Sequence, residues 1–136
     1  MSSNMNGDFG MRYRLFGKGT GLRVSELALG CGMFGTQWGY GADPTESRRM
    51  FNLYVEAGGN FLDTADSYQF GQSEELLGEF VGDKRDDFVI GTKFTNGDAA
   101  KPGLLAVGNN RKTMVRSVEA SLARGLTGLP ISVILS

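Results

Sequence analysis

Histidine is absent from the 136 residues, and cysteine occurs once, at Cys31. Because only carboxylates then remain as strong metal ligands, the composition does not support a metal site. A single cysteine cannot form a disulfide within the chain, which favours a reducing compartment. We therefore expect a cytoplasmic protein.

Long apolar runs and clusters of basic residues are absent as well. No run approaches the ~18 apolar residues of a membrane span, and the opening MSSNMNGDFG lacks the apolar core of a signal peptide. The net charge is −1, and no basic cluster exceeds two residues. These features argue against a membrane or a nucleic acid as partner. Residues 1–10 are predicted to be a disordered tail, and residues 11–136 a single domain.

Glycine, in contrast, is abundant, with 21 residues at about twice the usual frequency of ~7%. The glycines gather at the ends of segments, as in GKGTG, LGCGMFG and WGYG. They therefore separate many short elements from one another. No internal repeat or linker divides the chain.

The first elements predicted are a hairpin, a strand and a helix. Alternation at Tyr13 and Leu15 before a Gly-Lys-Gly turn predicts the hairpin, and a strand is expected over Glu26–Leu29. Asp43 is a good N-cap for a helix with Pro44 in its first turn, and Gly58 ends that helix.

The same alternation continues to the end of the chain. A second helix is expected to start at the N-cap Ser73, and a third to run over residues 111–124 with Met114, Val118 and Leu122 on one face. Short apolar runs predict strands over residues 60–63, 87–93 and 130–135. Strands that alternate with helices indicate an α/β fold with a parallel sheet.

Three polar residues follow or end the predicted strands. Asp63 and Lys93 each end a strand, and Tyr68 lies in the loop after Asp63. Functional groups of parallel α/β sheets collect at the carboxyl ends of strands, so the three are candidates for one site. Taken singly, each has a simpler explanation as a turn former, a packed ring or a solvated charge.

A competing signal is GCGMFG at residues 30–35, which matches the G-x-G-x-x-G pattern of dinucleotide-binding folds. That pattern requires a helix to open directly from the glycines, whereas here TQWGYGA intervenes before Pro44. A small nucleotide-binding domain of that type is therefore a weak alternative. Cys31 is better explained as a core thiol than as a nucleophile.

The stretch FLDTADSYQFGQSEELLG resembles the hallmark of the aldo/keto reductases, and the likeness extends over residues 12–124. RLFGKGTGLRVSELALGCGMFG resembles the hairpin and first strand of the bacterial and fungal branch, and VIGTKF its lysine-bearing third strand. The resemblance implies the N-terminal part of a (β/α)₈ barrel, about three and a half βα units after a hairpin. It also implies NADPH as cofactor and an aldehyde or ketone as substrate.

The same resemblance implies a role for each candidate residue. Tyr68 would donate a proton to the carbonyl oxygen, and Lys93 would favour the ionised phenol, since a nearby cation stabilises phenolate. Asp63 would hold Lys93 and contact the nicotinamide ribose. The loop formed by Cys31, Gly32 and Met33 would lie near the nicotinamide.

The likeness ends abruptly after Arg124. Where the family has an Asp-Tyr pair this chain has Gly128 and Leu129, and Ser136 falls on the family's active-site histidine. A shifted reading frame or a truncated gene would explain the break, with an atypical tail from residue 125. We then expect little or no activity from the chain alone. The alternative is a non-catalytic half-barrel that associates with itself or with another chain through open sheet edges.

Overall fold

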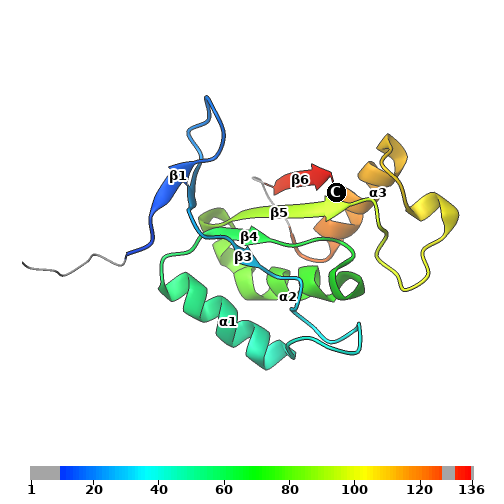
Figure 1. Ribbon diagram of the computed structural model, residues 1–136, viewed down its shortest axis with the longest axis horizontal. Coiled ribbons are helices and arrows are strands. Elements are labelled where there is room, and N and C mark those ends of the chain that lie inside the picture. The colour runs from blue at the N-terminus through cyan, green and yellow to red at the C-terminus, as the bar shows by residue number, and fades with distance from the viewer. Residues whose placement is uncertain (1–9, 127–130, 136) are drawn as a thin grey trace, which may run out of the picture.

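The computed structural model describes residues 10–126 and, for the backbone, residues 131–135. A hairpin of β1 (Tyr13–Leu15) and β2 (Arg23–Ser25) precedes a parallel sheet in the order β3-β4-β5-β6. The strands of that sheet are β3 (Leu29–Gly30), β4 (Phe61–Asp63), β5 (Val89–Phe94) and β6 (Ile131–Leu135). The predicted α/β class and parallel sheet are confirmed, and the described sheet is open (Figure 1).

The strand predicted over Glu26–Leu29 is wrong in its position, since the sheet strand starts only at Leu29. Residues 26–28 instead connect the hairpin to the sheet. The Glu26 carboxylate forms ion pairs with Arg12 and Arg14 of the hairpin. The carbonyl oxygen of Leu27 accepts a hydrogen bond from the hydroxyl of Tyr54, at 2.7 Å. These side-chain contacts turn the chain before it can pair with β4.

The first helix, α1 (Pro44–Glu56), begins and ends as predicted. The Asp43 carboxylate accepts a hydrogen bond from the backbone N–H of Glu46 at 2.8 Å, which satisfies one of the free donors of the first turn. After the last turn, Gly58 adopts a left-handed conformation with φ of 90°. Phe51 is the large apolar side chain that this helix buries completely.

The second helix, α2 (Gln72–Val81), differs from the prediction at its start. A short 3₁₀ helix, η1 (Tyr68–Gly71), leads directly into it, and the N-cap is Gly71 rather than Ser73. Ser73 lies inside the helix and is fully buried. Its hydroxyl donates to the carbonyl oxygen of Cys31 at 2.8 Å and lies 2.9 Å from the hydroxyl of Thr64. Ser73 therefore joins α2 to the sheet instead of capping the helix.

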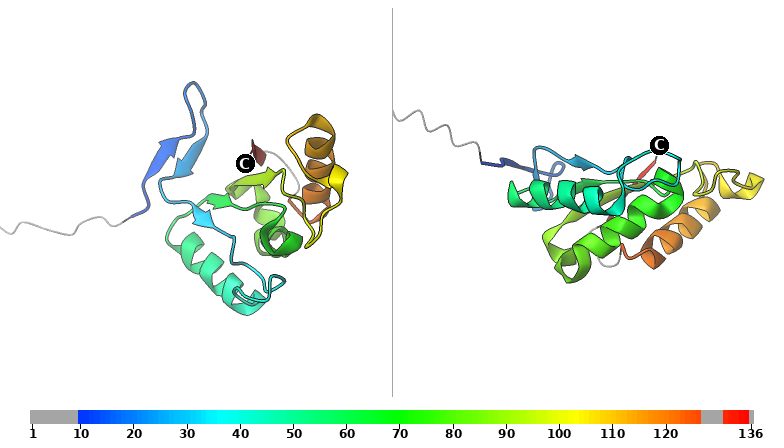
Figure 2. Two further views of the ribbon diagram at one scale, coloured as in Figure 1. Left: turned by 45° about the vertical axis from the view of Figure 1, so that its right-hand side comes forward. Right: turned by 90° about the horizontal axis from the view of Figure 1, so that it is seen from below.

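The core lies between the sheet and the helices that cover one of its faces (Figure 2). Its members come from the strands, from α1 and α2 and from the connecting loops: Cys31, Phe34, Phe51, Leu62, Leu76, Leu77, Val81, Phe88, Ile90 and Leu126. The ring of Phe51 packs against those of Phe80 and Phe88, with centroids 5.6 Å apart in each pair. Burial of this apolar surface is the main stabilising term of the fold.

The third helix, α3 (Arg111–Ala123), packs beside β5, but its predicted apolar face is largely exposed. Met114 and Leu122 are exposed, while Thr113 and Ser121 are the residues that the helix buries. A further 3₁₀ turn, η3 (Leu104–Ala106), lies in the loop before it, and η2 (Gly82–Asp87) precedes β5.

The last apolar run forms the predicted fourth strand, since β6 pairs with β5 in parallel over five residue pairs, from Ile90↔Ile131 to Phe94↔Leu135. Residues 1–9, 127–130 and 136 lie outside the described part, and with them most of the predicted N-terminal tail and the positions aligned with the family's Asp-Tyr pair and histidine. Among the described residues, no helix is long and apolar enough to cross a membrane.

Candidate active site

Neighbouring parallel strands bring Asp63 and Lys93 to the same edge of the sheet. Asp63 is the last residue of β4, and Lys93 is the fifth of the six residues of β5. The ladder pairs Asp63 with Gly91, so Lys93 lies two residues further along, beyond the end of β4. Side chains two residues apart point to the same face of a strand. The lysine therefore reaches back across the end of β4 to the aspartate.

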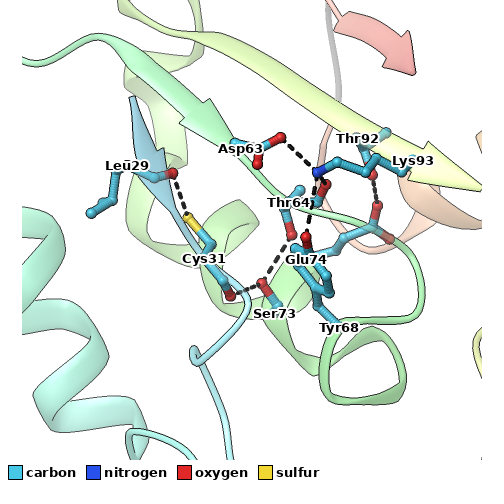
Figure 3. A network of polar contacts seen from close by, with 9 residues as sticks. All are labelled: Leu29, Cys31, Asp63, Thr64, Tyr68, Ser73, Glu74, Thr92 and Lys93. Atoms are coloured by element: carbon cyan, nitrogen blue, oxygen red, sulfur yellow. Dashed lines mark hydrogen bonds and ion pairs between the residues drawn. The ribbon is translucent and has the colours of Figure 1, made fainter. Parts of the chain in front are cut away.

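The ammonium group of Lys93 has three oxygen neighbours (Figure 3). It donates to Oδ1 of Asp63 at 2.7 Å and to the carbonyl oxygen of Thr64 at 2.8 Å, and it lies 3.5 Å from the hydroxyl of Tyr68. The first two distances are those of strong hydrogen bonds, and the third is at the limit of one. The side chains of Lys93 and Asp63 are 21% and 37% exposed, so this cluster is open to solvent and to small molecules.

Tyr68 lies over the lysine at the start of a segment whose backbone conformation is unusual. It starts η1, in which the next two residues, Gln69 and Phe70, have φ of 52° and 54°. Left-handed conformations are uncommon for residues other than glycine and cost roughly 1–2 kcal/mol each. The Lys93 ammonium lies 5.1 Å from the centre of the Tyr68 ring, within the range of a cation–π contact. The three residues proposed from their spacing thus form one constellation.

Aromatic rings surround the exposed side of this constellation. Trp38 packs edge-on against Tyr68 and against Phe70, with ring centroids 6.2 Å and 6.4 Å apart, and it also contacts Tyr40 at 5.8 Å. Trp38 and Tyr40 belong to the loop after β3, and Phe70 belongs to η1. Phe70 and Tyr40 are exposed. The site therefore has an aromatic wall on the side of the loop that follows β3.

A second polar cluster lies on the opposite side of β5. Thr92 points away from Lys93, and its hydroxyl donates to Oε1 of Glu74 at 2.6 Å. Glu74 is fully buried and also accepts from the hydroxyl of Ser121 at 2.8 Å and from Arg124 at 2.7 Å. Arg124 forms a further ion pair with Asp98. This buried network of Thr92, Glu74, Ser121 and Arg124 joins β5, α2 and the end of α3, and the partly exposed Asp98 lies at its edge.

Burial shifts the ionisation of groups in and beside the buried network. Desolvation raises the pKa of Asp66, and the nearby charges of Glu74 and Asp98 add to the effect, while a hydrogen bond from Ser117 and the charge of Arg124 oppose it. Desolvation alone would lower the pKa of Arg124, but its bonds to Glu74 and the charge of Asp98 outweigh that effect and raise it. The arginine therefore stays charged inside the protein.

The three residues of the loop predicted to lie near a cofactor, Cys31, Gly32 and Met33, differ in how far they are buried. Cys31 is fully buried, and desolvation together with the charge of Asp63 raises the pKa of its thiol to about 12. Its place in the hydrophobic core confirms the interpretation of Cys31 as a core thiol, and a raised pKa makes a thiol a poor nucleophile near neutral pH. Met33 is exposed, and Gly32 faces the Tyr68 ring, where an added Cβ would make an ordinary contact at 3.7 Å.

Two parts of the site were not foreseen from the sequence. The carbonyl oxygen of Thr64 as a partner of Lys93 leaves no signal in residue types, because backbone atoms are common to all residues. The aromatic wall does leave a signal, since Trp38 and Tyr40 occur close together in a glycine-rich loop. Their place beside Tyr68 depends on tertiary contacts that spacing alone does not show.

Comparison with known proteins agrees with this geometry. A profile of the aldo/keto reductase family matches residues 26–127. The chain belongs to the aldo/keto reductase family. It is 36% identical over 121 residues to the norsolorinic acid reductase of Aspergillus flavus, covering 82% of this chain and 31% of that protein. It is 44% identical over 89 residues to a Saccharomyces cerevisiae protein whose assignment as an aryl-alcohol dehydrogenase is itself inferred, covering 62% of this chain and 42% of that protein.

Solved structures of aldo/keto reductases show the same partial match. The chain superimposes on the holo form of an aldo-keto reductase from Bacillus halodurans with a TM-score of 0.78 and 32% identity, covering 92% of this chain and 40% of that chain. This aldo/keto reductase chain therefore spans less than half the length of the relatives it matches. The family typically uses NAD(P)H.

Proposed function

We propose that this chain is the N-terminal part of a (β/α)₈ barrel that reduces an aldehyde or ketone to an alcohol with NADPH. The observation that carries the proposal is the contact of the Lys93 ammonium with both Asp63 and Tyr68. An acid, a cation and a phenol at the carboxyl ends of parallel strands are suited to proton transfer to a carbonyl. The partial coverage of the relatives supports a barrel that continues beyond the described strands.

In this proposal Tyr68 gives its phenolic proton to the carbonyl oxygen while the carbonyl carbon accepts a hydride. Lys93 stabilises the phenolate that remains, because its ammonium lies against the phenolic oxygen. Asp63 fixes the lysine by a charge-assisted hydrogen bond and keeps it pointing at the tyrosine. The product alcohol has gained the hydride on carbon and the proton on oxygen, and Tyr68 is reprotonated from solvent.

The exposed end of this site fits the ribose end of a nicotinamide nucleotide. Asp63 is partly exposed, and a carboxylate can accept hydrogen bonds from ribose hydroxyls. Of the loop expected beside the nicotinamide, Gly32 and Met33 are the residues that can offer surface to it, since the side chain of Cys31 is buried. When bound, the reduced nicotinamide supplies the hydride. The protein positions the carbonyl and holds the proton.

An aryl aldehyde or aryl ketone is the proposed class of substrate. The aromatic wall of Trp38, Tyr40 and Phe70 stands beside Tyr68, and flat rings pack favourably against such walls. The Saccharomyces cerevisiae relative is named for aryl alcohols, which supports the same class. We expect the 136 residues alone to show little turnover, because the match covers less than half of each relative.

The test is a chimaera that joins residues 1–124 of this chain to the corresponding remainder of the Aspergillus flavus relative. We expect this protein to oxidise NADPH with benzaldehyde, and Tyr68→Phe to lower kcat by about 10²–10⁴-fold, the usual contribution of a positioned proton donor. Tyr13→Phe, which changes an exposed phenol of the hairpin outside the site, is the matched control and should retain activity. A chimaera that folds and binds NADPH but keeps full activity with Tyr68→Phe would contradict the proposal.

A second candidate function is a non-catalytic half-barrel that associates with itself or with another chain. Exposed apolar side chains favour it, notably Leu104 at 88%, Leu105 at 68%, and Met114, Val115 and Leu122 of α3. Apolar surface of this kind marks interaction sites in soluble proteins. Light scattering of the 136-residue chain should then show dimers or larger species that Leu104→Glu with Leu105→Glu dissociates. A monomer that binds no apolar dye would contradict this function.

A further inference from the structure

The loop between β3 and α1 is closed on itself and covers one side of the tyrosine. Its ends are bridged in parallel at Phe34 and Ala42, with the N–H of Gly35 donating to Ala42 at 2.8 Å and the N–H of Ala42 donating to Met33 at 2.7 Å. The loop tip carries Trp38, whose ring meets Tyr68. The ring contact alone is weak, worth roughly 1 kcal/mol. Something else must determine where the tip lies.

The side chain of Gln69 supplies that anchor from beneath the loop. Its Oε1 accepts from the backbone N–H of Trp38 at 2.8 Å, and its Nε2 donates to the carbonyl oxygen of Tyr40 at 3.0 Å, with a longer contact of 3.5 Å to that of Gly32. The amide is fully buried. A donor at Trp38 and an acceptor at Tyr40 fix the orientation of the amide, since the reverse orientation would oppose like atoms.

The backbone of Gln69 adopts a strained, left-handed conformation, and the hydrogen bonds of its side chain to the loop can compensate for that strain. Gln69 has φ of 52° and ψ of 34°, and it directly follows Tyr68. A left-handed glutamine persists only where its surroundings compensate for the conformational cost. The two short hydrogen bonds of the buried amide provide that compensation. The same residue thus fixes the backbone next to the proton donor and the loop that carries Trp38.

Glycine packing gives independent support. A Cβ at Gly41 would lie 2.0 Å from the carbonyl oxygen of Gly35 and 2.8 Å from Nε2 of Gln69. A Cβ at Gly39 would meet no atom within 4 Å, although both glycines have positive φ, of 132° and 87°. A side chain at Gly41 therefore has no room, chiefly because the loop closes on the carbonyl oxygen of Gly35 and also because the amide of Gln69 lies against it.

We infer that Gln69 is a positioning residue, which holds the Trp38 loop against Tyr68 and so sets the width of the site on its aromatic side. This inference rests on the proposed function for its meaning in substrate choice, because an aryl carbonyl would enter between the tyrosine and this wall. The position of Trp38 itself can be measured without any substrate. Trp38 is the only tryptophan of the chain, so its fluorescence reports this contact alone.

The experiment compares four variants of the 136-residue chain in two matched pairs. Gln69→Ala is paired with Gln72→Ala, whose side chain also holds the loop, but at the N–H of Thr36. Gly41→Ala is paired with Gly39→Ala, since both alanines would bear positive φ and only the first meets other atoms. Tryptophan emission and acrylamide quenching are measured, with far-UV circular dichroism and the urea midpoint to follow folding.

We expect Gln69→Ala and Gly41→Ala to shift Trp38 emission to longer wavelength and to raise the quenching constant toward that of the urea-unfolded chain. Gln72→Ala and Gly39→Ala should leave both close to the unsubstituted values. The inference is overturned if Gln69→Ala folds with unchanged emission and quenching, or if all four variants change alike. Should Gln69→Ala not fold, Gln69→Met, which keeps the length of the side chain and removes both amide hydrogen bonds, decides by the same criterion.

Activity of the chimaera separates a failure of the proposed function from a failure of the inference about Gln69. If Gln69 holds the Trp38 loop in place, Gln69→Ala in the chimaera should raise KM for benzaldehyde several-fold more than KM for propanal. Propanal has no ring and so does not depend on the aromatic wall. A chimaera without reductase activity would contradict the proposed function, whereas the fluorescence of the 136-residue chain would still decide the role of Gln69.

Discussion

Adjacent residues of β5 take part in two polar clusters that differ in almost every physical respect. Lys93 points to the face of the sheet where Asp63 and Tyr68 lie, and its ion pair is partly exposed. Thr92 points to the helical side, where Glu74 is 0% exposed and its partner Arg124 is largely buried. Both clusters contain an acid, a cation and a hydroxyl. Burial separates the cluster suited to chemistry from the cluster that holds the fold together.

The difference follows from how much solvation each group has lost. A buried ion pair is strongly coupled to its partners, and removal of one partner leaves an uncompensated charge inside the protein. An exposed pair is screened by water, so its loss alters stability little. The groups around Lys93 can therefore rearrange around a ligand at low cost, while those around Glu74 cannot. Substitutions on the two sides of β5 should show this contrast directly.

The largest effect is expected from Glu74→Gln, which removes the charge that faces Arg124 at 2.7 Å. The free energy of unfolding should fall by about 3 kcal/mol, the low end of the range for a broken buried pair, since Arg124 keeps its ion pair with Asp98. The neighbouring Glu75→Gln, on the exposed side of α2, should change it by less than about 0.5 kcal/mol. Urea denaturation followed by circular dichroism measures both. Equal effects of the two substitutions would contradict the contrast.

An intermediate effect is expected where the two clusters meet on β5. Thr92→Val removes the hydroxyl that donates to Glu74 at 2.6 Å and should lower the free energy of unfolding by about 2 kcal/mol, as for a hydrogen bond to a charged group. Lys93→Met should lower it by no more than about 1 kcal/mol, because its partner Asp63 is partly solvated. The same urea titrations measure both, and a larger cost for Lys93→Met would reverse the assignment of the two faces.

A smaller, pH-dependent effect is expected at Asp66, which adjoins the buried network. Its pKa is raised by burial and by Glu74 and Asp98, with Ser117 and Arg124 opposing. A raised pKa in the folded state means that protonation favours folding, so this contribution is complete below the ordinary pKa of aspartate and is lost as the pH rises through the raised pKa.

Asp66→Asn keeps an acceptor for Ser117 and carries no charge at any pH. The variant should therefore be more stable than the unsubstituted chain near pH 8, and the advantage should diminish as the pH is lowered toward the ordinary pKa of aspartate. Urea midpoints at several pH values measure the difference between the two chains. An advantage that grows toward acid pH would have the wrong sign.

The smallest effect concerns Cys31, a member of the core whose backbone N–H donates to the carbonyl oxygen of Asp63. Its thiol is fully buried and its pKa is about 12, so a disulfide reagent should react only when the chain opens. Reaction should be faster in Glu74→Gln, which lowers the cost of opening, and unchanged in Tyr68→Phe. The rate at which Ellman's reagent releases thionitrobenzoate measures this reaction, and rapid reaction of the folded chain would contradict the prediction.

Much of the fold could be predicted because its signals are local. The cap at Asp43, the glycine after α1 and the apolar strands β4, β5 and β6 depend on neighbouring residues, and they appear in the structure where they were expected. Asp63 and Lys93 could be placed at one edge because parallel strands end together.

What the sequence concealed depends on contacts between distant residues. Ser73 is a plausible N-cap by residue type, but the 3₁₀ turn that begins at Tyr68 makes the helix start before Ser73. The hydroxyl of Ser73 therefore donates to the carbonyl oxygen of Cys31 instead of capping the helix. The apolar pattern of α3 also misled, since Thr113 and Ser121 are buried while Met114 is exposed. Periodicity shows that a face is apolar, and it does not show which parts of a protein cover that face.

The parallel pairing of β5 with β6 has a practical consequence for the design of fusion proteins. Leu135 is level with Phe94, one residue beyond Lys93, so the backbone leaves β6 at the same rim as the lysine (Figure 1). A reporter or affinity tag joined after this strand would start beside the candidate site at Lys93. A tag placed before the hairpin would precede β1, which pairs with β2 in a sheet separate from that of β5. The N-terminal end is the better place to immobilise the protein for ligand binding.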